Sequence, residues 1–276
     1  MKRPLVLTVA GSDPTGGAGL ELDLAVVAHL GGLGMACATA LTTQDMTGVH
    51  DVHRLSGALI EKRLRVLLDD VRPDAIKVGM LAGPEQVTAV ERALARVPKD
   101  VPLVVDPVLL SSSGRELLSD SGKDVLMGGL ALRARVITPN LAEARRLARE
   151  GAAASAESAA RALLAKGIQA VLVTGGDEGG ENVVDHLADG DRRRTWRDAR
   201  IAGASPHGTG CALSTAMAVF LGLGRDLEEA VDAARRFVRE GIRHARGVGR
   251  RRGGRPRLQW EIRLDSKGEW GENDSR

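Results

Sequence analysis

The alternation of short apolar runs with amphipathic stretches of helical length restricts the fold of this chain most strongly. Six apolar runs have the length of buried strands: 5–10, 35–41, 75–78, 103–105, 136–138 and 171–174. Stretches with helical periodicity lie between the early runs, at about 19–30, 57–69 and 85–96. Continuous apolar strands that alternate with helices are typical of a parallel sheet covered on both faces. We therefore predict an α/β fold with a mostly parallel central sheet.

The pattern changes between about Glu181 and Trp196. Asp189 and Gly190 stand between two strand-like runs there, and an Asp-Gly pair in that position indicates a β-hairpin. Two helices are expected after the hairpin, at about 208–221 and 227–244. We predict one domain over residues 1–249, followed by a basic, polar and partly disordered tail over 250–276.

Composition narrows the functional classes. The chain has only 2 cysteines, no Cys/His cluster with zinc spacing and no apolar run long enough to cross a bilayer. No secretory signal pattern follows the first residues, so a cytoplasmic protein is expected. Arginines crowd the last part of the chain, but aromatic residues make up only 2% of it. Stacking on bases therefore has few candidates, and we favour a solvated tail over a nucleic-acid site.

Polar and glycine residues follow the predicted strands directly. Ligands bind at the carboxyl ends of the strands in open parallel sheets, so these positions are the ones to inspect. The residues that follow successive strands are Gly11, Gly16 to Gly19, Gln44, Met80, Asp106, Asn140, Glu143, Thr174 and Gly176. A solvated loop explains any one of them, but it explains the whole series poorly. The glycine cluster after the first strand matches neither a Walker loop nor a dinucleotide-binding fingerprint.

The strongest local motif is Gly208-Thr209-Gly210-Cys211, which opens a helix of small and apolar residues. Free amides at a helix N-terminus bind anions, and glycines allow a phosphate to approach closely. Cys211 lies in the first turn, where the field of the helix lowers a thiol pKa. The residues alone leave two interpretations open, because most free cysteines are simply buried small side chains.

Taken together, several blocks resemble the hydroxymethylpyrimidine (phosphate) kinases of the ribokinase superfamily. The blocks occur in the family's order over roughly residues 4–245: 10–19 followed by Asp23, then 39–44, 77–81, 106–108, 138–144 and 207–211. The resemblance implies a ribokinase-like fold and a homodimer. It also implies ATP and Mg²⁺ as cofactors and a small-molecule pyrimidine as the substrate.

The resemblance also assigns roles to residues. The substrate-binding positions are Gln44, Asp23, Gly11, Ala18 and Met80. The catalytic positions are Cys211, as the base, and the backbone amides of Gly208, Thr209 and Gly210. The nucleotide-binding positions are Thr174, Gly176 and Asn140. The metal-binding positions are Asp106 and Glu143, which would hold Mg²⁺ mainly through water.

Thr174 departs from the family's pattern, because many members have lysine there. Two other functions remain open. Pyridoxine also carries a hydroxymethyl group on an aromatic nitrogen ring, so a pyridoxal-type kinase is one alternative. A catalytically weak pyrimidine-binding regulatory module is the other, although the intact 208–211 motif argues against it.

Overall fold

The structure is a computed structural model that describes residues 3–111, 114–202, 206–248 and 256–260. The strands are β1 (Leu5–Ser12), β2 (Leu33–Asp45), β3 (Gly48–Arg54), β4 (Ala75–Val78), β5 (Leu103–Val105), β6 (Val136–Ile137), β7 (Ala170–Val173), β8 (Asn182–Asp189) and β9 (Arg192–Ala199). The helices are α1 (Gly19–His29), α2 (Gly57–Asp70), α3 (Pro84–Leu94), α4 (Asp120–Gly128), α5 (Leu130–Arg133), α6 (Leu141–Ala148), α7 (Ala156–Ala165), α8 (Thr209–Gly222) and α9 (Leu227–Arg243).

The strands form one sheet in the order β3-β2-β1-β4-β5-β6-β7-β8-β9. The six strands β2, β1, β4, β5, β6 and β7 are parallel to one another, and antiparallel strands lie at both edges. The predicted parallel core is therefore confirmed. Because the parallel strands point the same way, the loops after them all emerge at one end of the sheet.

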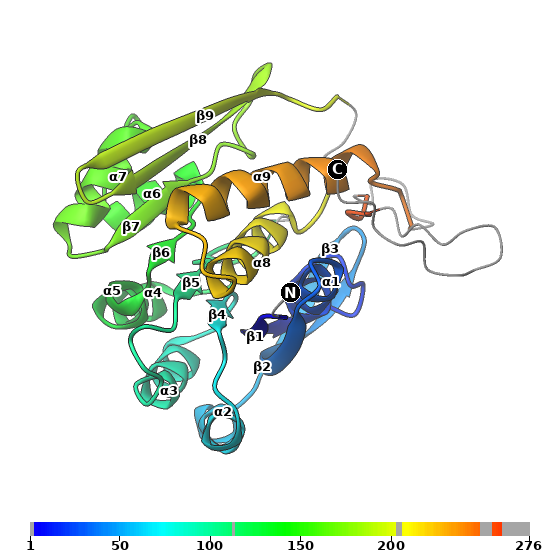
Figure 1. Ribbon diagram of the computed structural model, residues 1–276, viewed down its shortest axis with the longest axis vertical. Coiled ribbons are helices and arrows are strands. Elements are labelled where there is room, and N and C mark those ends of the chain that lie inside the picture. Colours follow the sequence, from blue (N-terminus) through cyan, green and yellow to red (C-terminus); the bar gives the residue numbers. More distant parts are fainter. Residues whose placement is uncertain (1–2, 112–113, 203–205, 249–255, 261–276) are drawn as a thin grey trace.

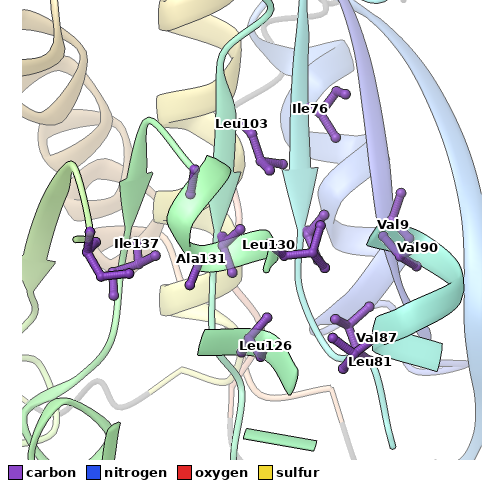
Figure 2. Close-up of a cluster of buried hydrophobic side chains, with 14 of the residues drawn as sticks. Val9, Ile76, Leu81, Val87, Val90, Leu103, Leu126, Leu130, Ala131 and Ile137 are labelled. Carbon is purple, nitrogen blue, oxygen red and sulfur yellow. The ribbon is translucent and has the colours of Figure 1, made fainter. Parts of the chain in front are cut away.

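Helices cover both faces of the sheet, as the apolar runs predict (Figure 1). Helices α1, α8 and α9 pack on one face over residues such as Val6, Val104 and Leu172. Helices α2 to α7 pack on the other face. Figure 2 shows part of that second core, where Val9 and Ile76 of the sheet lie among Val90, Leu126 and other side chains of the helices. Strands buried on both faces explain why the sequence shows continuous apolar runs rather than alternation.

Both edges of the sheet are hairpins. The predicted hairpin around Gly190 is confirmed: Asp189 pairs with Arg192, and Gly190 has φ 55. At the other edge, β2 is longer than expected and pairs with β3, with Asp45 accepting a hydrogen bond from the Thr47 amide in the turn. Within the described residues no helix is both long enough and apolar enough to span a membrane.

The predicted C-terminal tail lies largely outside the described residues, but 256–260 are described and pack against the domain. Leu258 is only 5% exposed, and the Trp260 ring stacks on Phe237 of α9 with centroids 4.6 Å apart. The prediction of a solvated tail is wrong for this short segment. The apolar side chains of Leu258 and Trp260 give the physical reason, because they have a surface of α9 to cover.

Candidate active site

The loops after the parallel strands meet at one end of the sheet, as the sequence predicts. Gly11 lies at the end of β1, Met80 follows β4, Asp106 follows β5, Asn140 follows β6 and Thr174 follows β7. The last two lie side by side, because the Thr174 amide donates to the Pro139 carbonyl at 3.0 Å and Asn140 pairs with Thr174 in a parallel bridge. Asn140 and Thr174 are therefore neighbours in the structure although they are far apart in the sequence.

The loop between β1 and α1 is organised by the carboxylate of Asp13. Its oxygens accept hydrogen bonds from the amides of Thr15 and Ala18, both at 2.9 Å, and from the Thr15 hydroxyl. Burial raises the pKa of Asp13, but hydrogen bonds from His207 and Thr15 outweigh it and bring the pKa below its ordinary value. Asp13 was not among the predicted site residues, although it stands in the glycine-rich block.

Gln44 joins this loop to the start of α8. Its Nε2 atom lies 3.2 Å from Asp13 Oδ2 and 3.0 Å from His207 Nε2. His207 immediately precedes Gly208, so the predicted substrate-binding amide and the predicted phosphate-binding turn are neighbours. Polar side chains, and not packed aliphatic ones, connect the two.

Glycines let the backbones at this point approach closely. A Cβ atom on Gly208 would lie 2.0 Å from the Gly17 carbonyl oxygen, and Gly208 has φ 83, a left-handed conformation. A Cβ atom on Gly11 would lie 2.9 Å from the Met80 sulfur. Gly11 and Met80 are therefore in contact.

Asp23 does not lie where the resemblance places it. Its side chain is fully buried and forms an ion pair with Lys77, which is also fully buried, at 2.7 Å. The hydroxyls of Thr8 and Thr215 donate to the same carboxylate. Burial lowers the pKa of Lys77, but the Asp23 carboxylate outweighs burial and raises the pKa above its ordinary value. Both Asp23 carboxylate oxygens are therefore engaged by neighbouring protein groups.

Asp106 and Glu143 lie beside the start of α8 and the loop after β5. Ser214 Oγ of α8 donates to Asp106 Oδ2 at 3.2 Å. Glu143 accepts from the amides of Leu109 and Asn140 and completes a capping box with Asn140 at the start of α6. Burial raises the pKa of Asp106 to about 6 and that of Glu143 to about 8, and the charge of Asp106 adds to the second shift. The Lys77 charge acts against the shift at Asp106, but burial outweighs it.

Cys211 lies in the first turn of α8, but its thiol differs from the prediction. Burial raises the pKa of Cys211 to about 12, although Lys77 acts in the opposite direction. The expected lowering of the thiol pKa by the helix field is therefore wrong. The physical reason is that loss of hydration and the charges of Asp106 and Asp23 outweigh the field of the helix start.

The predicted nucleotide-binding residues form a second, more exposed group. Asn140 Nδ2 donates to Asp177 at 3.0 Å, and Gly176 is exposed. Arg200, which sequence reasoning missed, donates to the Gly176 carbonyl at 2.9 Å and to Gly180 at 3.0 Å, which holds the loop after β7. A single arginine after a strand gives no recognisable signal in one sequence.

Two surface cavities are lined by residues outside these groups. One has a volume of about 280 Å³ and lies between β3 and the segment 115–117, near Ala82. The other, of about 550 Å³, lies between β9 and α9 and is rich in arginine, including Arg235 and Arg239. Neither is lined by Gln44 or Cys211, so the site is defined by converging polar groups and glycines rather than by either of these cavities.

Comparison with known proteins decides the family. A family model described as phosphomethylpyrimidine kinase matches residues 13–255. The chain belongs to this family. A hydroxymethylpyrimidine/phosphomethylpyrimidine kinase of Mycobacterium bovis is 39% identical, over 92% of this chain and 93% of the relative. A thiamine biosynthesis bifunctional protein of Geobacter sulfurreducens is 38% identical over 91% of this chain, but the match spans only 51% of that longer relative.

The fold is shared with solved vitamin kinases. The structure of the pyridoxal kinase from Staphylococcus aureus in complex with ADP superposes with a TM-score of 0.84 at 31% identity and covers 94% of each chain. The ribokinase-like architecture predicted from the sequence is thereby confirmed for this member of the phosphomethylpyrimidine kinase family.

Proposed function

We propose that this chain transfers the γ-phosphate of ATP to hydroxymethylpyrimidine and to its monophosphate in thiamine biosynthesis. One observation carries the proposal: Gln44 lies 3.0 Å from His207, directly before the glycine turn that starts α8. A group that can pair with a pyrimidine edge and a set of amides that can bind a phosphate therefore lie side by side. The names of the relatives agree with this chemistry.

Gln44 is proposed to bind the aminopyrimidine edge. An amide side chain offers a donor beside an acceptor, which matches an amino group beside a ring nitrogen. Met80, packed on Gly11, supplies a polarisable apolar face, and Ala18 limits the pocket on the loop side. Asp23 is proposed to act differently from the prediction: it holds the buried Lys77 in place and leaves substrate contact to Gln44.

Phosphoryl transfer is proposed to occur at the start of α8. The amides of Gly208, Thr209 and Gly210 would stabilise the charge on the transferred group, and Cys211 would accept the proton of the substrate hydroxyl. A base acts best with a pKa near the working pH. The Cys211 pKa of about 12 would therefore have to fall when ATP and the pyrimidine bind. The amides of Gly208 to Gly210 and the thiol of Cys211 all belong to the N-cap and first turn of α8.

Asp106 and Glu143 would hold Mg²⁺, which would neutralise charge on the phosphates. Their mutual repulsion in a buried site fits a cation between or beside them. No group of three or more metal-ligating side chains is found within the described part of the chain. Such a sparse ligand set suits Mg²⁺, which keeps several waters and binds substrate phosphates. Thr174, Gly176 and Asn140 are proposed to contact the nucleotide.

We also propose that the protein is a cytoplasmic homodimer. Leu41 of β2 is 47% exposed beside the edge strand β3, which is the kind of apolar surface that a second copy could cover. Sedimentation at micromolar concentration tests this part of the proposal. A monomer at all concentrations would contradict it without affecting the proposed chemistry.

Steady-state kinetics with mass analysis of the product test the activity. Hydroxymethylpyrimidine and its monophosphate are each supplied with ATP and Mg²⁺, and phosphorylated products are expected from both. In Gln44→Ala, KM for the pyrimidine is expected to rise about tenfold or more, since the half-buried amide that is proposed to pair with the pyrimidine is lost. Thr43→Ala, which alters an exposed neighbour, is the matched control. Absence of any product with the wild-type protein would contradict the proposal.

A pyridoxal kinase is the second candidate, because the Staphylococcus aureus structure is so similar. The same assay with pyridoxal separates the two. A kcat/KM for hydroxymethylpyrimidine above that for pyridoxal supports the first proposal, and the reverse order would replace it.

A further inference from the structure

The segment Pro256–Trp260 lies against His207, close to the start of α8. The His207 amide donates to the Pro256 carbonyl at 3.1 Å. Arg246, just after α9, and Arg257 exchange backbone hydrogen bonds of 2.9 and 3.1 Å. The segment is therefore tied by backbone bonds both to the end of α9 and to the residue that precedes the glycine turn.

Apolar contacts anchor the same segment to α9. The Trp260 ring lies parallel to that of Phe237, with an interplanar angle of 9°, and its Nε1 donates to the Phe237 carbonyl at 2.9 Å. A Cβ atom on Gly241 would lie 2.7 Å from two carbons of the Trp260 ring. Gly241 therefore leaves the space that Trp260 occupies, and Leu258 is buried beside it.

Arg257 extends from this anchored segment to the loop between β1 and α1. Its Nη2 donates to the Gly16 carbonyl at 2.7 Å, and a Cβ atom on Gly16 would lie 2.8 Å from the same nitrogen. Gly16 has φ 63, a conformation in which only glycine avoids strain. A charged donor to a carbonyl gives a stronger hydrogen bond than a neutral donor.

This contact reaches the proposed pyrimidine-binding residue through the loop. The Gly16 amide donates to the Asp13 carbonyl, and the Asp13 carboxylate in turn holds Thr15, Ala18 and Gln44. Gly17 also packs on the His207 ring, since a Cβ atom there would lie 3.0 Å from Cδ2. A shift of Gly16 would therefore displace the groups that orient Gln44.

We propose that Arg257 is a positioning residue that fixes the 13–18 loop against His207 and so prepares Gln44 for the pyrimidine. The inference rests on the proposed function, because it assumes that Gln44 binds the substrate. Arg257 does not touch the reacting atoms. It acts through Gly16, and it gives one arginine of the basic C-terminal region a role within the domain rather than on nucleic acid.

Arg257→Gln is the direct test. KM for hydroxymethylpyrimidine is expected to rise about tenfold, which corresponds to about 1.4 kcal/mol, while kcat and KM for ATP stay within twofold of wild type. Arg257→Lys, which keeps a donor but loses the fork geometry, is expected to recover part of the affinity. Arg96→Gln removes an exposed arginine near Asp69 and is the matched control.

Gly241→Ala tests the same idea without touching Arg257. Alanine favours the helix, so α9 itself should not be weakened, but the added methyl group would displace Trp260 and with it the segment. The same selective rise in KM is expected. Hydrogen exchange of the amides of 15–18 should become faster in both variants, and thermal melting controls for global unfolding.

The outcomes separate this inference from the proposed function. If the wild-type protein phosphorylates the pyrimidine and both variants keep its KM within twofold, the positioning role of Arg257 is wrong. A fall in kcat with unchanged KM would also overturn it, because Arg257 would then affect the chemical step and not loop position. If the wild-type protein phosphorylates no pyrimidine, the proposed function itself fails.

Discussion

Two groups of buried charged residues lie near Cys211, and they differ in how their charges are compensated. Around Asp23 every carboxylate oxygen is engaged, and the opposite charge of Lys77 is in direct contact. Around Asp106 and Glu143 the donors that the structure describes are hydroxyl, thiol and amide groups. The Lys77 charge also acts on Asp106, but burial outweighs it, and both pKa values are raised. A cluster whose charges are directly paired stabilises a fold, whereas buried carboxylates without a directly paired cation suit a ligand that brings positive charge.

The ion pair with Lys77 indicates a role for Asp23 other than the substrate contact that the family resemblance implies. A residue that stands in a motif can serve the site without touching the substrate. Here the motif aspartate supports Lys77, whose charge lies close enough to Cys211 and Asp106 to affect both pKa values. The predictions below test whether the two groups really differ in this way.

The largest effect is expected at Lys77. Lys77→Met removes one partner of a fully buried pair and leaves the Asp23 charge without compensation, which costs about 3–5 kcal/mol of unfolding free energy. Urea denaturation measures this loss. Lys62→Met, the same change at an exposed position of α2, is the control and should cost little. A loss below about 1 kcal/mol for Lys77→Met would mean that the buried Lys77–Asp23 ion pair contributes little to stability.

Cys211→Ala should affect turnover rather than folding. If the thiol is the base, kcat falls at least about 100-fold, while the free energy of unfolding changes by about 1 kcal/mol or less. Cys37→Ala removes the other cysteine, which is buried far from the turn, and should leave kcat unchanged. Unchanged turnover in Cys211→Ala would remove the residue from the proposed chemistry.

Alkylation of the ligand-free protein tests the electrostatics around that thiol. With a pKa of about 12, Cys211 carries almost no thiolate at pH 8, so iodoacetamide should modify it at least about tenfold more slowly than a free cysteine of pKa about 8.5. The thiolate fraction grows as pH rises toward the pKa, so the rate should still be increasing at about pH 10. Peptide mass mapping follows the reaction. An alkylation rate that stops rising near neutral pH would show that the helix field does lower the pKa of Cys211.

The smallest effect is expected at Ser214. Ser214→Ala removes the hydroxyl that donates to Asp106 and should lower the free energy of unfolding by about 1 kcal/mol. Urea denaturation again gives the value. A loss of about 3 kcal/mol or more would mean that stability depends on the interactions of Asp106 as strongly as on the Lys77–Asp23 ion pair, and the two groups would then not differ in the proposed way.

The sequence predicted the sheet well because its signal is local. Short apolar runs identify strands such as Ala75–Val78 and Leu103–Val105, and the Asp189-Gly190 pair identifies a turn, since these patterns depend on a few neighbouring residues. The rule for ligand sites in parallel sheets then predicted that the candidate site residues meet at one end of the sheet, and the loops that carry them do emerge there.

The details that the sequence could not supply are all non-local. Whether Asp23 faces a ligand or a buried lysine depends on Lys77 and Thr215, which are distant in the chain. The thiol pKa of Cys211 depends on burial and on charges brought in by other strands. Arg257 carries no motif of its own, and the 207–211 block does not show what the His207 side chain contacts, so the contacts of both residues with the 13–17 loop become visible only in three dimensions.

The touching glycines, Gly17 and Gly208, also limit what can be engineered here. The position of residue 208 is restricted twice, by a left-handed backbone and by a carbonyl oxygen where a methyl group would be. Even alanine there would force the loop that holds Gly17 away from the turn that starts α8. If Met80 and Gln44 bind the substrate as proposed, redesign of the substrate range should begin there, because their side chains can change volume without separating the two backbones.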